Sequence, residues 1–163
     1  MDGIELTGAH EPRDPQQQGR KANNNGRFFE QLISQSLRSR GYAECGNAPP
    51  VASKPFFVPQ SKGRFESIYG IPMTVDFYVW HPEKFERGLI IECKYQETGG
   101  SADEKFPYTV LSLKKTGVPA ILLLIGAGAK RKAVDWCIRQ QSTALTVFTS
   151  VEAFLRRANG GLL

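Results

Sequence analysis

Residues that build disulfide frameworks and zinc sites are scarce in this sequence. Among 163 residues there are three cysteines and two histidines, and no two cysteines form a C-x-x-C pair. An odd number of widely spaced cysteines argues against a disulfide framework, and His10 and His81 do not match a two-histidine metal site. A reducing, intracellular setting is therefore expected, either cytoplasmic or in the host cytoplasm if the protein is phage-encoded.

Long apolar runs and several common catalytic motifs are also missing. The longest apolar run, residues 118–125, is far too short to cross a membrane. The polar N-terminus does not have the pattern of a signal peptide. Neither the phosphate-cradling G-x-x-x-x-G-K motif nor a G-x-S-x-G nucleophile motif occurs. These absences argue against a membrane protein, an ATP-using enzyme and a serine hydrolase.

The composition fits one globular domain and leaves a polyanionic partner open. Of the residues, 40% are hydrophobic, and 21 Lys and Arg against 16 Asp and Glu give a net charge of +5. A chain of this length can bury a sizeable core. A moderate positive excess is compatible with nucleic-acid binding and does not prove it.

The chain is predicted to begin with a polar arm and to continue as one domain. Residues 1–25 are rich in Gln, Asn, Asp, Gly and Pro, so they can bury little and are expected to form a mobile arm. Residues 26–163 are expected to form the folded domain. Its first helix is predicted from apolar residues at helical spacing between Phe28 and Leu37, with residues 23–25 as N-caps and Gly41 as the stop.

Hydrophobic periodicity in the remaining chain alternates between strand and helix patterns. The predicted strands cover residues 54–58, 65–69, 73–80, 88–96, 119–125 and 144–149, with a basic turn at residues 62–64. The predicted helices cover residues 104–117, 129–141 and 151–157, with a cap signal at Asp103. This order favours an α/β sandwich, in which a mixed sheet is flanked by helices.

The most informative segment places an acidic residue on one apolar strand and a Glu and a Lys on the next. Asp76 lies on the third predicted strand, and Glu92 and Lys94 lie on the fourth. Because side chains of a strand alternate between two faces, Glu92, Lys94 and Gln96 are predicted to share one face. Charges on a buried strand are costly unless something offsets their lost solvation. A divalent metal held by Asp76 and Glu92, with Lys94 turned toward a phosphate, would offset that cost.

This arrangement resembles the PD-(D/E)XK nuclease superfamily, whose fold is restriction-endonuclease-like. The matching residues are Asp76 on one strand and the segment Glu92-Cys93-Lys94 on the next, while Val75 replaces the Pro of the family motif. The resemblance covers approximately residues 28–125. It implies a core made of a helix, a three-strand meander, a second helix and a further strand, which is the order predicted from the periodicity.

The resemblance also implies a metal-dependent site. Asp76 and Glu92 would bind Mg²⁺, for which Mn²⁺ can substitute, together with the main-chain carbonyl of Cys93. The metal would activate a bound water and neutralise phosphate charge. Lys94 would orient or deprotonate that water, or stabilise the transition state. In the family an acidic residue on the first helix often faces the metal, and Glu30 is the best match to it.

Each of these residues has a plainer interpretation as well. Glu92 and Lys94 could form a salt bridge on a half-exposed strand, with Asp76 at the surface. Glu30 could be a solvated residue at the border of the apolar helical stripe. Gln96 could contact the nucleic-acid backbone or a metal-bound water, as the resemblance implies, or it could end its strand in solvent.

Cations and a tyrosine downstream of the fourth strand are candidates for contact with DNA. Lys105 and Tyr108 follow a glycine-containing loop and are expected on one side of the next helix, whose N-terminus attracts anions. A run of three cations opens a later helix against the preference of the helix dipole, namely Lys130, Arg131 and Lys132. The alternative for all of these residues is a solvated face that binds nothing.

These observations together predict a Mg²⁺-dependent deoxyribonuclease, expected to be an endonuclease, with DNA as its partner. No helix-turn-helix or zinc finger for base readout is evident, so a homodimer, a place in a larger assembly and recognition of DNA structure all stay open. Two rival functions also stay open. One is a non-catalytic nucleic-acid-binding module, and the other is an interaction subunit of a larger nuclease, transposase or restriction complex.

Overall fold

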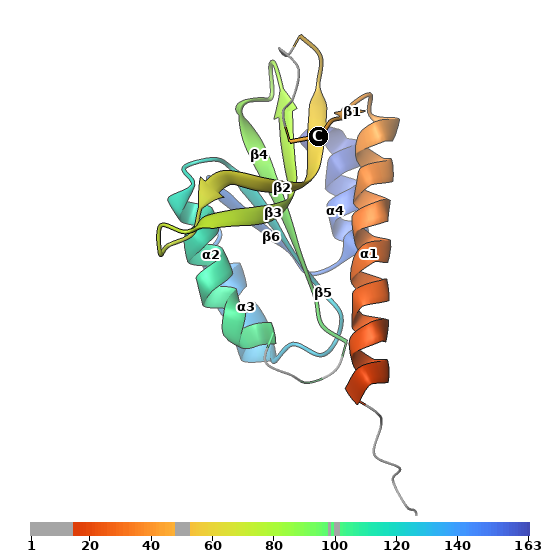
Figure 1. Ribbon diagram of the computed structural model, residues 1–163, viewed down its shortest axis with the longest axis vertical. Helices are drawn as coiled ribbons and strands as arrows, with labels where there is room; N and C mark the ends of the chain where they lie inside the picture. The colour runs from red at the N-terminus through yellow and green to blue at the C-terminus, as the bar shows by residue number, and fades with distance from the viewer. Residues whose placement is uncertain (1–14, 48–52, 98, 100–101) are drawn as a thin grey trace, which may run out of the picture.

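The computed structural model describes residues 15–47, 53–97, 99 and 102–163. Within these residues one mixed sheet carries helices on both faces (Figure 1). The strands are β1 (Ala43–Glu44), β2 (Phe56–Glu66), β3 (Pro72–His81), β4 (Phe85–Tyr95), β5 (Ala120–Ile125) and β6 (Leu145–Phe148). The helical segments are α1 (Pro15–Ser39), the 3₁₀ turn η1 (Ala102–Lys105), α2 (Phe106–Lys115), α3 (Arg131–Arg139), α4 (Val151–Arg157) and the π-helical turn η2 (Ala158–Leu162). The predicted α/β sandwich is therefore confirmed.

The strands lie in the sheet in the order in which they follow one another along the chain. β2, β3 and β4 form an antiparallel meander, whereas β4, β5 and β6 are parallel, and β1 is parallel to β2. β5, which lies between β4 and β6, is buried along most of its length, in keeping with its apolar sequence. No helix in the described part of the chain is both long and apolar enough to span a membrane.

Two hydrophobic cores lie on opposite faces of this sheet. One core packs the sheet against α1 and α4, and it includes Ile33, Ile91 and Phe154. The other packs the sheet against α2 and α3, and it includes Ile90 and Phe106. Adjacent residues of β4 therefore face different cores, as the period-two alternation of a strand predicts.

The first helix begins earlier than predicted. α1 starts at Pro15, so residues 15–25, predicted as part of the arm, are helical, and residues 1–14 lie outside the described residues. Asn25, predicted as an N-cap, lies inside the helix. Its side-chain amide donates to the hydroxyl of Tyr95 at 2.8 Å and to the carboxylate of Glu97 at 3.2 Å. Contacts with the end of β4, rather than capping of α1, therefore satisfy this amide.

The second strand is longer than predicted. β2 is one strand of eleven residues, where the sequence predicts two short strands separated by a basic turn. Gly63 adopts a φ of 67°, and the register with β3 shifts between Lys62 and Phe65. The glycine therefore makes a β-bulge and not a turn, because β3 continues to pair with β2 on both sides of it.

Candidate active site

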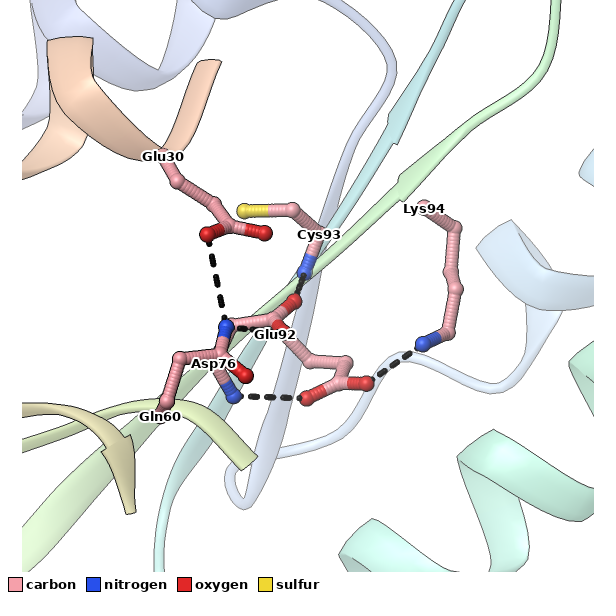
Figure 2. A network of polar contacts seen from close by, with 6 residues as sticks. All are labelled: Glu30, Gln60, Asp76, Glu92, Cys93 and Lys94. Carbon is pink, nitrogen blue, oxygen red and sulfur yellow. Dashed lines mark hydrogen bonds and ion pairs between the residues drawn. The ribbon is translucent and has the colours of Figure 1, made fainter. Parts of the chain in front are cut away.

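The candidate site lies where β3 separates from β4. The backbone ladder between these strands ends at the pair Phe77–Ile91, and beyond it two side chains accept the backbone N–H groups. The N–H of Asp76 donates to Oε2 of Glu92 at 3.1 Å, and the N–H of Cys93 donates to Oδ2 of Asp76 at 2.7 Å. The two carboxylates thus cross the gap between the strands (Figure 2). These charge-assisted hydrogen bonds orient both acids.

An ion pair continues the site along one face of β4. Nζ of Lys94 lies 2.5 Å from Oε1 of Glu92, and the two side chains are 33% and 10% exposed. In Figure 2 the thiol of Cys93 lies toward Glu30, while Lys94 extends to the opposite side. The predicted alternation along β4 is therefore confirmed. The salt bridge of the plainer interpretation is present, but its carboxylate is buried and not half-exposed.

The site carries more negative than positive charge. Burial, and next the Asp76 carboxylate, raise the pKa of Glu92, which the Lys94 ammonium only partly opposes. Burial by itself lowers the pKa of Lys94, but the adjacent Glu92 outweighs it and the pKa of Lys94 is raised on balance. Burial and the nearby carboxylates also raise the pKa of the Cys93 thiol well above its ordinary value. A cation at this point would offset the repulsion between the acids.

A third carboxylate reaches the site from α1 through a glutamine. Nε2 of Gln60 donates to Oε2 of Glu30 and to Oδ1 of Asp76, both at 3.3 Å (Figure 2). Burial and the Asp76 carboxylate raise the pKa of Glu30, whereas the hydrogen bond from Gln60 lowers it. The structure therefore brings Glu30 to the strands, as predicted. Sequence reasoning missed Gln60, because no local pattern marks a contact that joins three separate segments.

The donors at the site are suited to a hard cation. Asp76 and Glu92 offer carboxylate oxygens from neighbouring strands, and the main-chain carbonyl of Cys93 lies between Glu92 and Lys94 along β4. Among the described residues, no group of three His, Cys, Asp or Glu side chains could hold a metal ion. Mg²⁺ commonly takes only one or two carboxylates and keeps water and phosphate oxygens as its other ligands. The residues present therefore fit a hard divalent cation that keeps water and phosphate oxygens among its ligands, and they do not fit a zinc site.

Comparison with known proteins decides the family. Residues 21–159 match the model of the PD-(D/E)XK nuclease superfamily domain. The chain belongs to the PD-(D/E)XK nuclease superfamily. No curated protein and no solved structure matches the chain. Membership confirms the predicted resemblance, agrees with the observed α/β fold, and supports a nuclease-type function.

In this superfamily domain Gln96 is part of a buried contact. Gln96 is 8% exposed, and its Nε2 donates to the carbonyl of Gly128 at 3.1 Å. The backbone carbonyl of Gln96 also approaches Gly126 so closely that a Cβ at position 126 would lie 2.2 Å from it. The alternative that Gln96 ends its strand in solvent is therefore wrong. Its observed contact holds the loop after β5 against the end of β4, while its contact with substrate stays a prediction.

Two other candidates for substrate contact lie at the start of α2. Lys105 occupies the N-cap position of this helix and makes no side-chain cap hydrogen bond. Tyr108 is 39% exposed, and its ring lies 5.4 Å from the ring of the exposed Tyr69 on the loop between β2 and β3. Both side chains are thus accessible on the superfamily domain, but neither belongs to the carboxylate cluster of Figure 2.

The three cations at the start of α3 are partly paired within the protein. Nζ of Lys130 lies 3.3 Å from Oδ2 of Asp103, which is only 5% exposed. Arg131 lies 3.9 Å from Asp135 one turn along the helix, and Lys132 is exposed. The predicted capping role of Asp103 is wrong, because Asp103 lies inside η1 and Lys105 occupies the N-cap position of α2. Lys130 is therefore paired with a buried carboxylate of the protein, whereas Arg131 and Lys132 are exposed.

A groove lies along α1 next to the carboxylates. It has a volume of about 580 Å³, and Glu30, Phe77 and Pro59 form the part nearest the site. Arg27 and Arg38 also line it, from positions eleven residues apart on α1. An α-helix rises 1.5 Å per residue, so the two arginines are separated by roughly 16 Å along the helix. Sequence reasoning did not single out these arginines, because they are spread along one helix instead of forming a run.

Proposed function

We propose that the protein is a divalent-metal-dependent deoxyribonuclease that hydrolyses phosphodiester bonds within DNA. The observation that carries this proposal is the crossed pair of Asp76 and Glu92 beside Lys94, in a chain of the nuclease superfamily. A binding module without catalysis would gain little from two partly buried acids whose charges repel each other. The same acids suit a site that receives a cation and a phosphate.

Asp76, Glu92 and the main-chain carbonyl of Cys93 would hold Mg²⁺, with Mn²⁺ as a substitute. When bound, the ion would lower the pKa of a water and neutralise charge on the scissile phosphate. The two carboxylates are already oriented by backbone N–H groups. Such hydrogen bonds behind the ligands fix the direction of their other oxygens, which point toward Gln60 from Asp76 and toward Lys94 from Glu92.

Lys94 would act on the phosphate and the attacking water. It is held next to Glu92, and a third of its side chain is exposed, so its ammonium can approach a substrate oxygen at the mouth of the site. A cation in a partly buried site stabilises the charge that develops on the phosphoryl oxygens. Glu30 would accept a hydrogen bond from a water at the site and orient it.

DNA would lie across the carboxylates and along basic surfaces around them. The groove beside α1 offers Arg27 to the phosphate backbone, whereas Arg38 is paired with Glu44, another residue of the groove. Gln96, Lys105, Tyr108 and the three cations of residues 130–132 are further proposed contacts. The net charge of +5 favours a polyanionic partner. A homodimer or a larger assembly would extend this surface, since one domain of this size covers little of a duplex.

The proposal is tested by incubating the purified protein with supercoiled, linear, single-stranded and branched DNA. Each substrate is tested with Mg²⁺, with Mn²⁺ and with EDTA. We expect cleavage with either metal and none with EDTA, and nicked circles would identify an endonuclease. Shortening of linear DNA from its ends alone would identify an exonuclease. Binding without cleavage in every condition would favour the non-catalytic module instead.

The role of Glu30 is tested by a neutral variant. Glu30→Gln is expected to reduce the cleavage rate substantially, because the carboxylate that would orient a water is lost, while an amide oxygen can still accept the hydrogen bond from Gln60. The melting temperature should stay within a degree or two, since the side chain is only half-buried. An unchanged cleavage rate would remove Glu30 from the site.

The basic start of α3 is tested through the salt dependence of DNA binding. Neutralising Arg131 and Lys132 together should flatten the slope of log affinity against log salt, because fewer counterions are released on binding. Lys130 is left in place in this variant, since its removal would leave the buried Asp103 carboxylate without its ion pair. A slope identical to that of the wild type would show that this face is only solvated. A further variant that also neutralises Lys130 then shows, through its melting temperature, how much the ion pair with Asp103 contributes to stability.

A further inference from the structure

The backbone of Gln60 has an unusual conformation for its residue type. Its φ of 48° makes it the one non-glycine residue with positive φ in the described part of the chain. This left-handed region is costly for most L-residues and is commonly occupied by Gly or Asn. Residues held in such conformations concentrate at functional sites, where the surroundings maintain them.

The bend in β2 and β3 explains how Gln60 reaches the site. Pro59 pairs with Phe77 and Ser61 pairs with Val75, so Gln60 lies opposite Asp76 at the centre of this register. Near this point the two strands turn together away from the direction of β4 (Figure 1). The turn carries the side chain of Gln60 between α1 and β3, where its amide meets both acids (Figure 2).

The amide of Gln60 is placed between two like charges. Its Nε2 carries two N–H groups, which is the number needed to donate to Glu30 and to Asp76 at once. Each hydrogen bond offsets part of the repulsion between the carboxylates without adding a charge. The contact also ties α1 to β3, which otherwise reach the site from distant parts of the chain.

We propose that Gln60 is a positioning residue that holds the carboxylates of Glu30 and Asp76 in place for the incoming metal ion. This role rests on the proposed function, because it needs Asp76 to be a metal ligand. Gln60 touches neither substrate nor metal in this role and acts through the two acids. Gln occupies this left-handed position, where Gly or Asn would cost less, because a shorter side chain would not reach both carboxylates.

The test uses two variants that relieve the backbone and remove the bridge. Gln60→Asn suits positive φ better than Gln but is shorter by one methylene, or about 1.5 Å. Since both hydrogen bonds already measure 3.3 Å, the shorter amide cannot bridge the two acids. Gln60→Gly relieves the backbone fully and has no amide. Gln140→Asn, a matched shortening at the end of α3 beside Lys114, is the control.

Three measurements are made on the full chain: the melting temperature in EDTA, the Mn²⁺ affinity by calorimetry, and the Mn²⁺ concentration that gives half-maximal cleavage. For both Gln60 variants we expect an unchanged or higher melting temperature. The Mn²⁺ affinity should fall, and the Mn²⁺ concentration for half-maximal cleavage should rise, each by roughly tenfold or more, as for other residues behind metal ligands. The rate at saturating Mn²⁺ should change little, and Gln140→Asn should match the wild type in all three measurements.

Other outcomes overturn the assignment. Mn²⁺ affinities equal to that of the wild type would show that Gln60 does not position the acids. A lower melting temperature with unchanged Mn²⁺ affinity would show that the bridge is only structural. If either of these two outcomes is found and the wild type cleaves DNA with Mn²⁺, the proposed function survives and only the role of Gln60 fails. A wild type that neither binds Mn²⁺ nor cleaves DNA would overturn the proposed function and the role of Gln60 together.

Discussion

Lys94→Ala is expected to lower the rate of DNA cleavage by about a hundredfold or more, the effect of losing an electrostatic or acid-base group at a reacting phosphate. Lys94 would act mainly in the transition state, where charge builds on the phosphoryl oxygens and the water loses its proton. Interactions made only there change turnover and hardly affect ground-state binding. Cleavage rates at saturating Mg²⁺ measure this loss directly.

Binding separates this catalytic role from that of a simple phosphate contact. In Ca²⁺, Lys94→Ala should weaken DNA binding only by the loss of about one phosphate contact. This loss corresponds to a change of roughly 0.9 in the slope of log affinity against log salt. Lys94→Arg should restore the rate only in part, because the pKa of Arg is too high for proton exchange and its planar group is wider. If Lys94 only contacts phosphate, its loss weakens binding and Arg replaces it well.

The control for Lys94 lies at the far end of the same pair of strands. Lys84 is in the turn between β3 and β4, beyond the pair His81–Phe85, whereas the site lies beyond the opposite end of the ladder. Its Nζ donates to the carbonyl of Leu163, so Lys84→Ala removes a charge and a hydrogen bond away from the acids. Lys84→Ala should cut DNA at the wild-type rate. A Lys94→Ala protein that does the same would refute the catalytic assignment of the strand.

Asp76→Asn and Glu92→Gln are each expected to abolish cleavage while leaving folding and DNA affinity nearly intact. Each amide keeps one oxygen that can accept the backbone N–H now bound by the carboxylate. Each loses the charge that Mg²⁺ requires. In the double variant the melting temperature should stay close to that of the wild type, because the removal of two acids that repel each other offsets the loss of the ion pair between Glu92 and Lys94.

Metal binding and a matched control complete this test. Calorimetry with Mn²⁺ should show binding to the wild type and none to the double variant. Glu66→Gln, at the exposed end of β2, removes one carboxylate outside the site and should change neither cleavage nor Mn²⁺ binding. Equal Mn²⁺ binding by the wild type and the double variant would mean that the metal site is elsewhere in the protein.

Much of the fold follows from local patterns in the sequence. α4, the apolar part of β4 and β5 were predictable because each has a strong local pattern: helical spacing in α4, alternation after Ile91 in β4 and an unbroken apolar run in β5. Predictions failed where a local signal had a different tertiary use. Gly63 makes a bulge inside β2, and Asp103 pairs with Lys130 instead of capping α2. Turn and cap signals report what a residue allows, and the neighbouring segments decide which use is made of it.

The sequence by itself determined the chemistry of β4. Alternation of side chains is a local property of any strand, so Glu92 and Lys94 had to share one face, opposite to Cys93. The approach of Asp76 followed from its place on the adjacent strand of a meander. The tertiary structure alone decided the other side of the site. Glu30 and Gln60 meet Asp76 only because α1 packs on one face of the sheet and β2 bends with β3. Those contacts depend on the packing of distant segments, which no spacing within the chain specifies.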